Sequence, residues 1–149
     1  MKKYKISMIC LMLLSLITTC VFFMFMNDTV PTHIGIDGKP DQFGSKYFLL
    51  FLPLIMIIIG TIMLIVERFA KISENYKKYM LLTGIVIETV FLALSVVFSV
   101  YALLYVEETP AFDFSKVIMI IMGLMFIVLG NFMPKIEKNR TLGLKTYWS

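Results

Sequence analysis

One acidic residue, Glu88, lies inside a long apolar run and is the side chain best placed to do chemistry. The run 79–106 has 28 residues and carries no other charge. If the run is helical, Glu88 lies about 13 Å from its start, close to the middle of a ~30 Å hydrocarbon core. A charge at that depth is costly unless it is paired or protonated, so an intramembrane acid is a candidate functional residue by default.

Small and polar residues share the helical face of Glu88. Steps of three or four residues bring Gly84, Ser95, Ser99 and Ala102 onto that face, which suits the interior of a helix bundle. One interpretation is a proton- or peptide-responsive site in which Ser95 and Ser99 accompany Glu88. The other is packing, in which a neutral Glu88 is hydrogen-bonded to a hydroxyl of another helix. The hydroxyls available for this bond belong to Ser15, Thr18, Thr19 and Thr61.

The segment 27–46 is a second candidate site. Five turn-forming residues make it too turn-rich for a simple linker: Pro31, Gly35, Gly38, Pro40 and Gly44. We expect an ordered hairpin-like loop, which either only ties two helices together or also contacts a ligand. His33 is the residue that can change charge near neutral pH, beside Asp28, Asp37 or Asp41, although a structural hydrogen bond is the simpler role.

Several kinds of chemistry are disfavoured by what the chain contains. Its two cysteines, Cys10 and Cys20, lie in one apolar run, about 15 Å apart if the run is helical, which is too far for a disulfide. With one histidine, the chain lacks the residues for a Cys/His zinc site or a Ser–His–Asp hydrolase. There is no glycine-rich phosphate loop. We therefore expect a non-enzyme with no metal, no cofactor and no nucleic-acid partner.

The elements that position these residues follow from the composition. Of 149 residues, 59% are hydrophobic and 16% are charged, and the mean hydropathy is +0.87. These values favour an integral membrane protein over a soluble domain. Four apolar runs are long enough to span a bilayer, at 6–26, 47–66, 79–106 and 117–133. The predicted fold is an all-α membrane protein with four transmembrane helices in a bundle and an ordered outer loop, forming a single domain over 1–149.

Basic residues predict the orientation. Eleven lie in the N-terminal segment, the loop 67–78 and the tail 134–149, against three in the loops 27–46 and 107–116. Because basic loops stay in the cytoplasm, both termini are expected inside a cytoplasmic membrane, with 27–46 and 107–116 outside. The inner loop 67–78 is basic enough to contact anionic headgroups. In the fourth run, Gly123 and Gly130 are seven residues apart and predict a close-packed face.

Two stretches resemble known bacterial membrane families. The outer loop "VPTHIGIDGKPDQFGSK" resembles a membrane domain of unknown function through Pro31, His33, Gly38, Asp41, Gly44, Ser45 and Lys46. The tail "GNFMPKIEKNRTLGLKTYWS" resembles the family of immunity proteins against the sporulation-delaying peptide toxin. The matching tail positions are Gly130, Asn131, Pro134, Lys135, Asn139, Gly143, Lys145, Thr146 and Trp148. The family carries arginine where this chain has Lys145. It also continues with further helices beyond the motif, whereas this chain ends at Ser149. Two interpretations are therefore open, a short natural member of the family and a truncated one.

The resemblance implies a bacterial cytoplasmic-membrane protein that binds or neutralises a hydrophobic peptide toxin. In this interpretation, the peptide is held by the outer loop and the polar face, through Glu88, His33, Asp37, Asp41, Ser95 and Ser99. A second implied role is signalling, with a cytoplasmic regulator recruited to the basic inner surface. The alternatives are a small transporter or permease-like accessory subunit, and a structural partner of a larger membrane complex.

Overall fold

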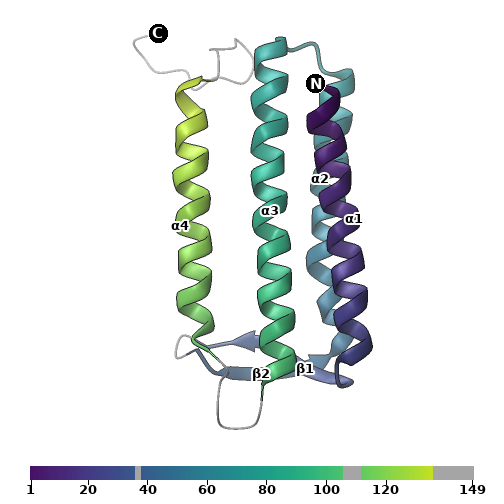
Figure 1. Cartoon of the computed structure of the whole chain (residues 1–149), viewed down its shortest axis with the longest axis vertical. Helices are drawn as coiled ribbons and strands as arrows, with labels where there is room; N and C mark the ends of the chain where they lie inside the picture. Colours follow the sequence, from purple (N-terminus) through teal and green to yellow (C-terminus); the bar gives the residue numbers. More distant parts are fainter. Residues whose placement is uncertain (36–37, 106–111, 136–149) are drawn as a thin grey trace.

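Four long helices dominate the computed structural model, which describes residues 1–35, 38–105 and 112–135 (Figure 1). They are α1 (Lys2–Phe25), α2 (Phe51–Phe69), α3 (Glu74–Leu104) and α4 (Phe114–Phe132), and a 3-10 turn at Lys46–Leu50 leads into α2. All four are long and apolar enough to cross a membrane, the second counted together with its 3-10 turn. The predicted fold class is therefore confirmed, and the chain is a multi-pass membrane protein by length and composition.

Local chemistry sets the helix ends. The Ser73 hydroxyl accepts a hydrogen bond of 3.2 Å from the Tyr76 amide and caps the start of α3. Ser45 accepts from the Tyr47 amide in the same way, at 3.5 Å, where the 3-10 turn begins. Pro53 lies in the first turn of α2, a position where proline is tolerated. Serine hydroxyls therefore satisfy free backbone amides at the start of α3 and of the 3-10 turn that leads into α2.

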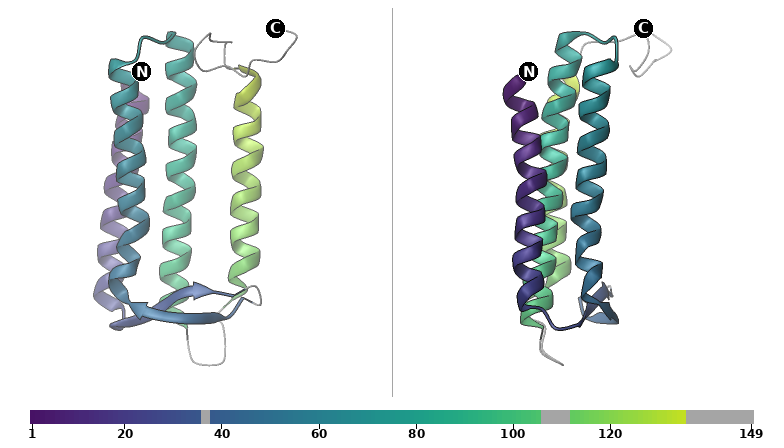
Figure 2. Two further views of the ribbon diagram at one scale, coloured as in Figure 1. Left: turned by 180° about the vertical axis from the view of Figure 1, so that it is seen from behind. Right: turned by 90° about the vertical axis from the view of Figure 1, so that its right-hand side faces the viewer.

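The helices do not pack equally. α1, α2 and α3 form a three-helix core, whereas α4 lies against the far side of α3, as the left view of Figure 2 shows. Buried residues of the core include Met8, Met12 and Leu81, while Phe114 is the one buried residue of α4. The four-helix prediction is thus confirmed with a refinement, because the fourth helix flanks a core that the other three build.

The predicted close-packed face of Gly123 and Gly130 is wrong. A Cβ atom added at either glycine would meet nothing within 4 Å. The residues of α4 that face α3 are Ile121, Leu124, Met125 and Val128, and both glycines fall on the opposite side of this helix. The sequence spacing placed the two glycines correctly on one face, but that face points away from the core.

The segment between α1 and α2 forms a β-hairpin. β1 (Thr29–Ile34) pairs antiparallel with β2 (Pro40–Ser45), and Gly38 takes a φ of 77° in the turn, which favours glycine. The hairpin lies across one end of the helices (Figure 1). The buried hydroxyl of Tyr101 in α3 donates a 3.1 Å hydrogen bond to the Gly38 carbonyl and ties the turn to the core. The prediction of an ordered loop is confirmed.

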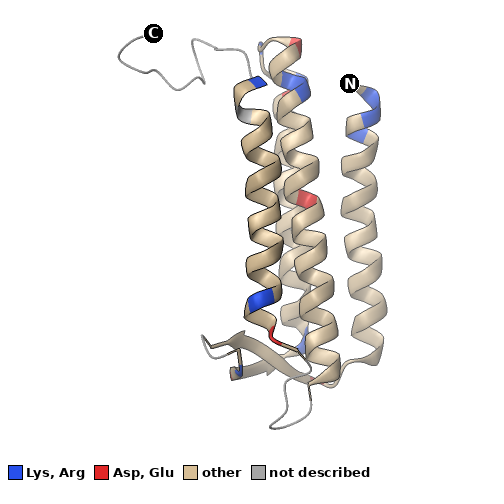
Figure 3. Cartoon of the chain, turned by 60° about the vertical axis from the view of Figure 1, so that its left-hand side comes forward, with Lys and Arg blue, Asp and Glu red and all other residues tan. Residues whose placement is uncertain are grey.

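Charged side chains gather at the two ends of the helices, with one acidic position between them (Figure 3). We call the end opposite the hairpin the basic end. It carries Lys2, Lys3, Lys5, Arg68, Lys71, Lys77, Lys78 and Lys135. This distribution agrees with the charge bias expected of a membrane protein. The assignment of the basic end to the cytoplasm stays a prediction.

Candidate functional site

The predicted polar face of α3 is buried in the three-helix core. Gly84, Glu88, Ser95 and Ser99 are all buried, and Glu88 has no exposed surface. Glu88 lies near the midpoint of α3, and its carboxyl Oε1 lies over Gly60 of α2, beside the methyl end of Met12 of α1. The prediction of a shared interior face is confirmed, while ligand binding by Glu88, Ser95 and Ser99 stays a prediction.

α1 and α3 run side by side with a constant register. The Met8 side chain faces Gly84, Met12 lies beside Glu88, and the Thr19 hydroxyl is 3.3 Å from that of Ser95. Each pair is 76 residues apart in sequence. The buried Ser15 falls between Met12 and Thr19 on α1. A polar column, made of Glu88, Ser15, Thr19, Ser95 and Ser99, therefore runs from mid-helix toward the hairpin.

Most of the polar column has unused hydrogen-bonding capacity. Within the described chain, Ser15 Oγ, Ser99 Oγ and both carboxyl oxygens of Glu88 have no hydrogen-bond partner. The predicted bond from Glu88 to a hydroxyl is not formed, since Thr19 pairs with Ser95, Thr18 bonds to backbone carbonyls and Thr61 is exposed. Buried polar atoms normally have partners. The column is therefore a row of buried polar groups with free hydrogen-bonding capacity, and a ligand or proton role for it stays a prediction.

The Thr19–Ser95 hydrogen bond gives a testable energetic coupling. We expect Thr19→Val and Ser95→Ala each to destabilise the protein, because each leaves one buried hydroxyl without its partner. The double variant should cost less than the sum, by about 0.6 kcal/mol, the usual coupling between hydroxyls inside membrane proteins. A double-mutant cycle of unfolding in mixed detergent micelles measures it. Strictly additive losses would show that the bond contributes nothing.

The hairpin brings together part of the second predicted site. His33 Nδ1 lies 2.6 Å from Asp41 Oδ1, so the histidine has the acidic neighbour that the sequence suggested. Asp28 instead pairs with Lys46 at 2.9 Å, and the hydrogen bond and charge of Lys46 lower the pKa of Asp28. Asp37 lies outside the described residues. His33 and Asp41 therefore form the described polar pair of the hairpin.

A cavity of about 450 Å³ lies beneath the hairpin, and we call it the hairpin pocket. Its hairpin wall includes His33 and Ile34, and its helical wall includes Phe98 of α3 with Phe114 and Ile118 of α4. The pocket thus has aromatic and aliphatic walls with a histidine on one side. Such a lining suits an apolar ligand that carries a polar group.

A second cavity, which we call the α3–α4 groove, continues along the same pair of helices. It measures about 330 Å³ and its lining is almost wholly apolar. The groove is lined by Ile85, Val86, Thr89, Val90, Ala93, Ile121, Leu124, Met125 and Val128. An aromatic pair joins α3 and α4 at each end of the groove. The ring centroids are 5.9 Å apart for Phe98–Phe114 and 6.3 Å apart for Tyr79–Phe132.

The two cavities lie one after the other along the contact between α3 and α4, which we call the seam. They share no lining residue, and the Phe98–Phe114 contact lies at the end of the groove nearer the hairpin. Ile118 lines the hairpin pocket and Ile121, one helical turn further along α4, lines the α3–α4 groove. Glu88 does not face this seam, because its carboxyl is held among α1, α2 and α3. About 20 Å of helix also separates Glu88 from Tyr101, which holds the hairpin. The structure thus brings His33 to the seam and keeps the polar column apart from it.

The described part of the tail motif ends α4. Asn131 donates to the Ile127 carbonyl, and Pro134 and Lys135 lie in a 3-10 turn, Met133–Lys135. The Lys135 carbonyl accepts a 3.4 Å hydrogen bond from Asn75, which joins the ends of α3 and α4. Gly130 lies on the open face described above. Asn139, Gly143, Lys145, Thr146 and Trp148 lie outside the described residues.

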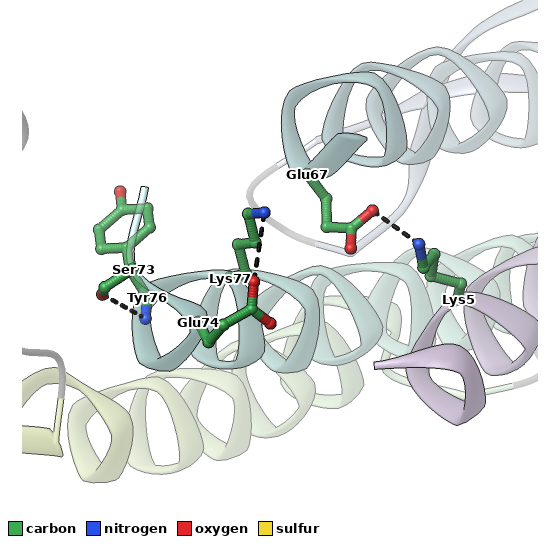
Figure 4. Close-up of polar contacts among 6 residues, drawn as sticks. All are labelled: Lys5, Glu67, Ser73, Glu74, Tyr76 and Lys77. Carbon is green, nitrogen blue, oxygen red and sulfur yellow. Dashed lines mark hydrogen bonds and ion pairs between the residues drawn. The ribbon is translucent and has the colours of Figure 1, made fainter. Parts of the chain in front are cut away.

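Sequence reasoning missed an ion pair at the basic end. Lys5 Nζ lies 2.8 Å from Glu67 Oε2, and the two side chains point toward one another from α1 and α2 (Figure 4). Only 7% of the Glu67 side chain is exposed. The sequence places Glu67 in the loop 67–78, whereas in the structure it lies in the last turn of α2. The available signal was an acid at the end of an apolar run, at the same end of the helices as the lysines in the first turns of α1.

Comparison with known proteins adds a partial relationship. Residues 10–57 match a family described as a domain of unknown function, DUF1648. An uncharacterized protein of Archaeoglobus fulgidus is 49% identical over 41 residues, which are 28% of this chain and 22% of that protein. No solved structure matches. The resemblance to a domain of unknown function is thus confirmed in this coarse form, and the resemblance of the tail to immunity proteins stays a prediction.

Proposed function

We propose that this protein confers immunity by binding a membrane-active hydrophobic peptide in the seam between α3 and α4. The observation that carries the proposal is that the hairpin pocket and the α3–α4 groove lie one after the other along the same two helices. A peptide arriving at the hairpin end would meet His33 and the aromatic wall first, and its apolar part would then lie along the groove. Similarity of the tail motif to toxin-immunity proteins supports the same ligand class.

The physical basis of protection is competition for the apolar face of the peptide. In lipid there is little hydrophobic driving force between helices, so close packing has to supply the affinity. Thr89 and Ala93 are small enough for another backbone to approach α3 closely. A peptide packed there presents less of its surface for assembly with other peptide copies. Permeabilisation of the bilayer is then reduced without any covalent chemistry.

Signalling is a further part of the proposal. If the basic end faces the cytoplasm, as its charge predicts, occupancy of the seam can be transmitted through α4, whose contacts lie chiefly with α3. Asn75 and Lys135 join these helices at the basic end, where a cytoplasmic regulator would bind. Such signalling needs two conformations with different affinities for the peptide, and we propose that they differ in the position of α4 relative to α3.

A second candidate function is a small transporter or accessory subunit, and one observation favours it. Glu88 is an acid at mid-helix with no hydrogen-bond partner among the described residues, as is common on proton and ion pathways. This candidate predicts solute- or proton-dependent flux in vesicles that Glu88→Gln abolishes. The immunity proposal predicts no such flux.

Survival of sensitive bacteria tests the proposal. Cells that express the chain, and matched cells with an empty vector, are challenged with the sporulation-delaying peptide and with an unrelated pore-forming peptide. We expect protection against the first peptide alone. Equal killing of both cell lines by the sporulation-delaying peptide, with the protein verified in the membrane, would refute specific immunity. Protection against both peptides would indicate a general effect on the envelope.

A further inference from the structure

A third cavity, independent of the seam, lies between α1 and α2 at the basic end. It measures about 300 Å³. Its inner wall is apolar, with Ile9 of α1 and Leu64 and Ile65 of α2, and its mouth carries Lys5, Glu67 and Arg68. An apolar cavity with charged residues at its mouth, near the membrane boundary, is complementary to a lipid. The acyl chain would lie inside the cavity and the headgroup at its mouth.

The charges at the mouth favour an anionic headgroup. Glu67 is neutralised by Lys5 at 2.8 Å, so it does not leave a free negative charge beside the cavity. Among the described residues, no carboxylate forms an ion pair with Arg68, whose guanidinium lies 5.5 Å from the centre of the Phe69 ring. The mouth therefore carries one net positive charge, which matches one phosphodiester.

Hydrogen-bond geometry supports the same ligand. A guanidinium donates two parallel N–H bonds to phosphate oxygens, and it does so without losing its charge. The Lys5 ammonium has three N–H donors and bonds to one carboxylate oxygen in the structure, which leaves donors for a second acceptor. Basic pockets between transmembrane helices are a recurrent site for anionic lipids.

We infer that the cavity between α1 and α2 binds the acyl chain and phosphate of an anionic phospholipid, with Arg68 as the principal phosphate ligand and Lys5 as the second. The part-buried Lys5–Glu67 pair joins the two helices that form the walls of the cavity. Phosphatidylcholine is disfavoured, because its own cation has no anionic partner at the mouth.

The test measures lipid retention by the purified full chain in a neutral detergent, using native mass spectrometry. Phosphatidylglycerol and phosphatidylcholine with identical acyl chains are added in equal amounts. We expect the wild type to retain phosphatidylglycerol about tenfold better, a difference of about 1.4 kcal/mol. Arg68→Gln should bring the ratio close to one. Lys71→Gln, which removes an exposed charge just beyond α2 that does not line the cavity, should leave the ratio unchanged.

Two further arms separate a lipid from a free phosphate group. Ile65→Trp fills the apolar cavity and keeps every charge, so it should reduce retention of phosphatidylglycerol. Glycerophosphoglycerol, the headgroup without chains, should not displace the lipid. Equal retention of the two lipids by the wild type, an unchanged ratio in Arg68→Gln, an equal loss in Lys71→Gln, or displacement by the headgroup alone would overturn the inference.

Discussion

Replacing Gly60 by leucine is expected to prevent the three-helix core from packing. A Cβ atom at this position would collide with Glu88 Oε1 and the methyl carbon of Met12, and would lie 3.1 Å from the Met12 sulfur. An alanine can be accommodated, because both neighbours are the ends of flexible side chains. A leucine needs space that α1 and α3 already fill, and overpacking of this kind costs about 3 kcal/mol or more.

The apparent melting temperature in detergent measures the effect. Gly123→Leu is the matched control, since a Cβ atom there meets nothing within 4 Å and α4 adds little to the core. We expect a large decrease for Gly60→Leu, a small one for Gly60→Ala and almost none for Gly123→Leu. If Gly60→Leu and Gly123→Leu had the same melting temperature, the close contact of Glu88 with α2 would be wrong.

Filling the α3–α4 groove should weaken peptide binding while the protein remains folded. In Ala93→Phe, an aromatic ring replaces a methyl group on the α3 wall of the groove. The three-helix core is built without this face, so the melting temperature should change little. Because a peptide could no longer approach the backbone of α3, its affinity should fall at least about tenfold, or ~1.4 kcal/mol.

The control for this variant is Leu103→Phe, which adds a ring on the same helix at a residue that is 42% exposed and lines neither cavity. Binding of the sporulation-delaying peptide to vesicles containing each variant is compared with binding to the wild type. Unchanged affinity in a folded Ala93→Phe would remove the groove from the proposed site. An equal loss in Leu103→Phe would point to a nonspecific effect of added bulk.

The sequence predicted the architecture well because bilayer physics leaves few choices. A run of about 20 uncharged residues must be helical to satisfy its backbone in lipid, and each of the four runs became a helix. The helical period also located the buried face of α3, with Gly84, Glu88, Ser95 and Ser99 all inside. Turn residues correctly indicated an ordered segment between α1 and α2.

What could not be predicted is which helices pack together. The four runs are apolar over most of their surface, so the pattern does not show which apolar faces contact lipid and which contact another helix. The flanking position of α4, and with it the α3–α4 groove, therefore required the structure. The small residues Gly123 and Gly130 were misleading for the same reason. Likewise, Glu67 was recognisable as buried only once α1 and α2 were placed side by side.

Photo-crosslinking from α4 tests the central claim, that the seam holds the peptide, most directly. A benzophenone amino acid is placed at Leu124, which lines the groove, or at Ile127, which is 65% exposed and does not line it. Each protein is reconstituted into vesicles and irradiated with the sporulation-delaying peptide. The account predicts cross-linked peptide from position 124 alone, and its loss when Ala93→Phe is added. Equal cross-linking from both positions, or none from position 124, would contradict it.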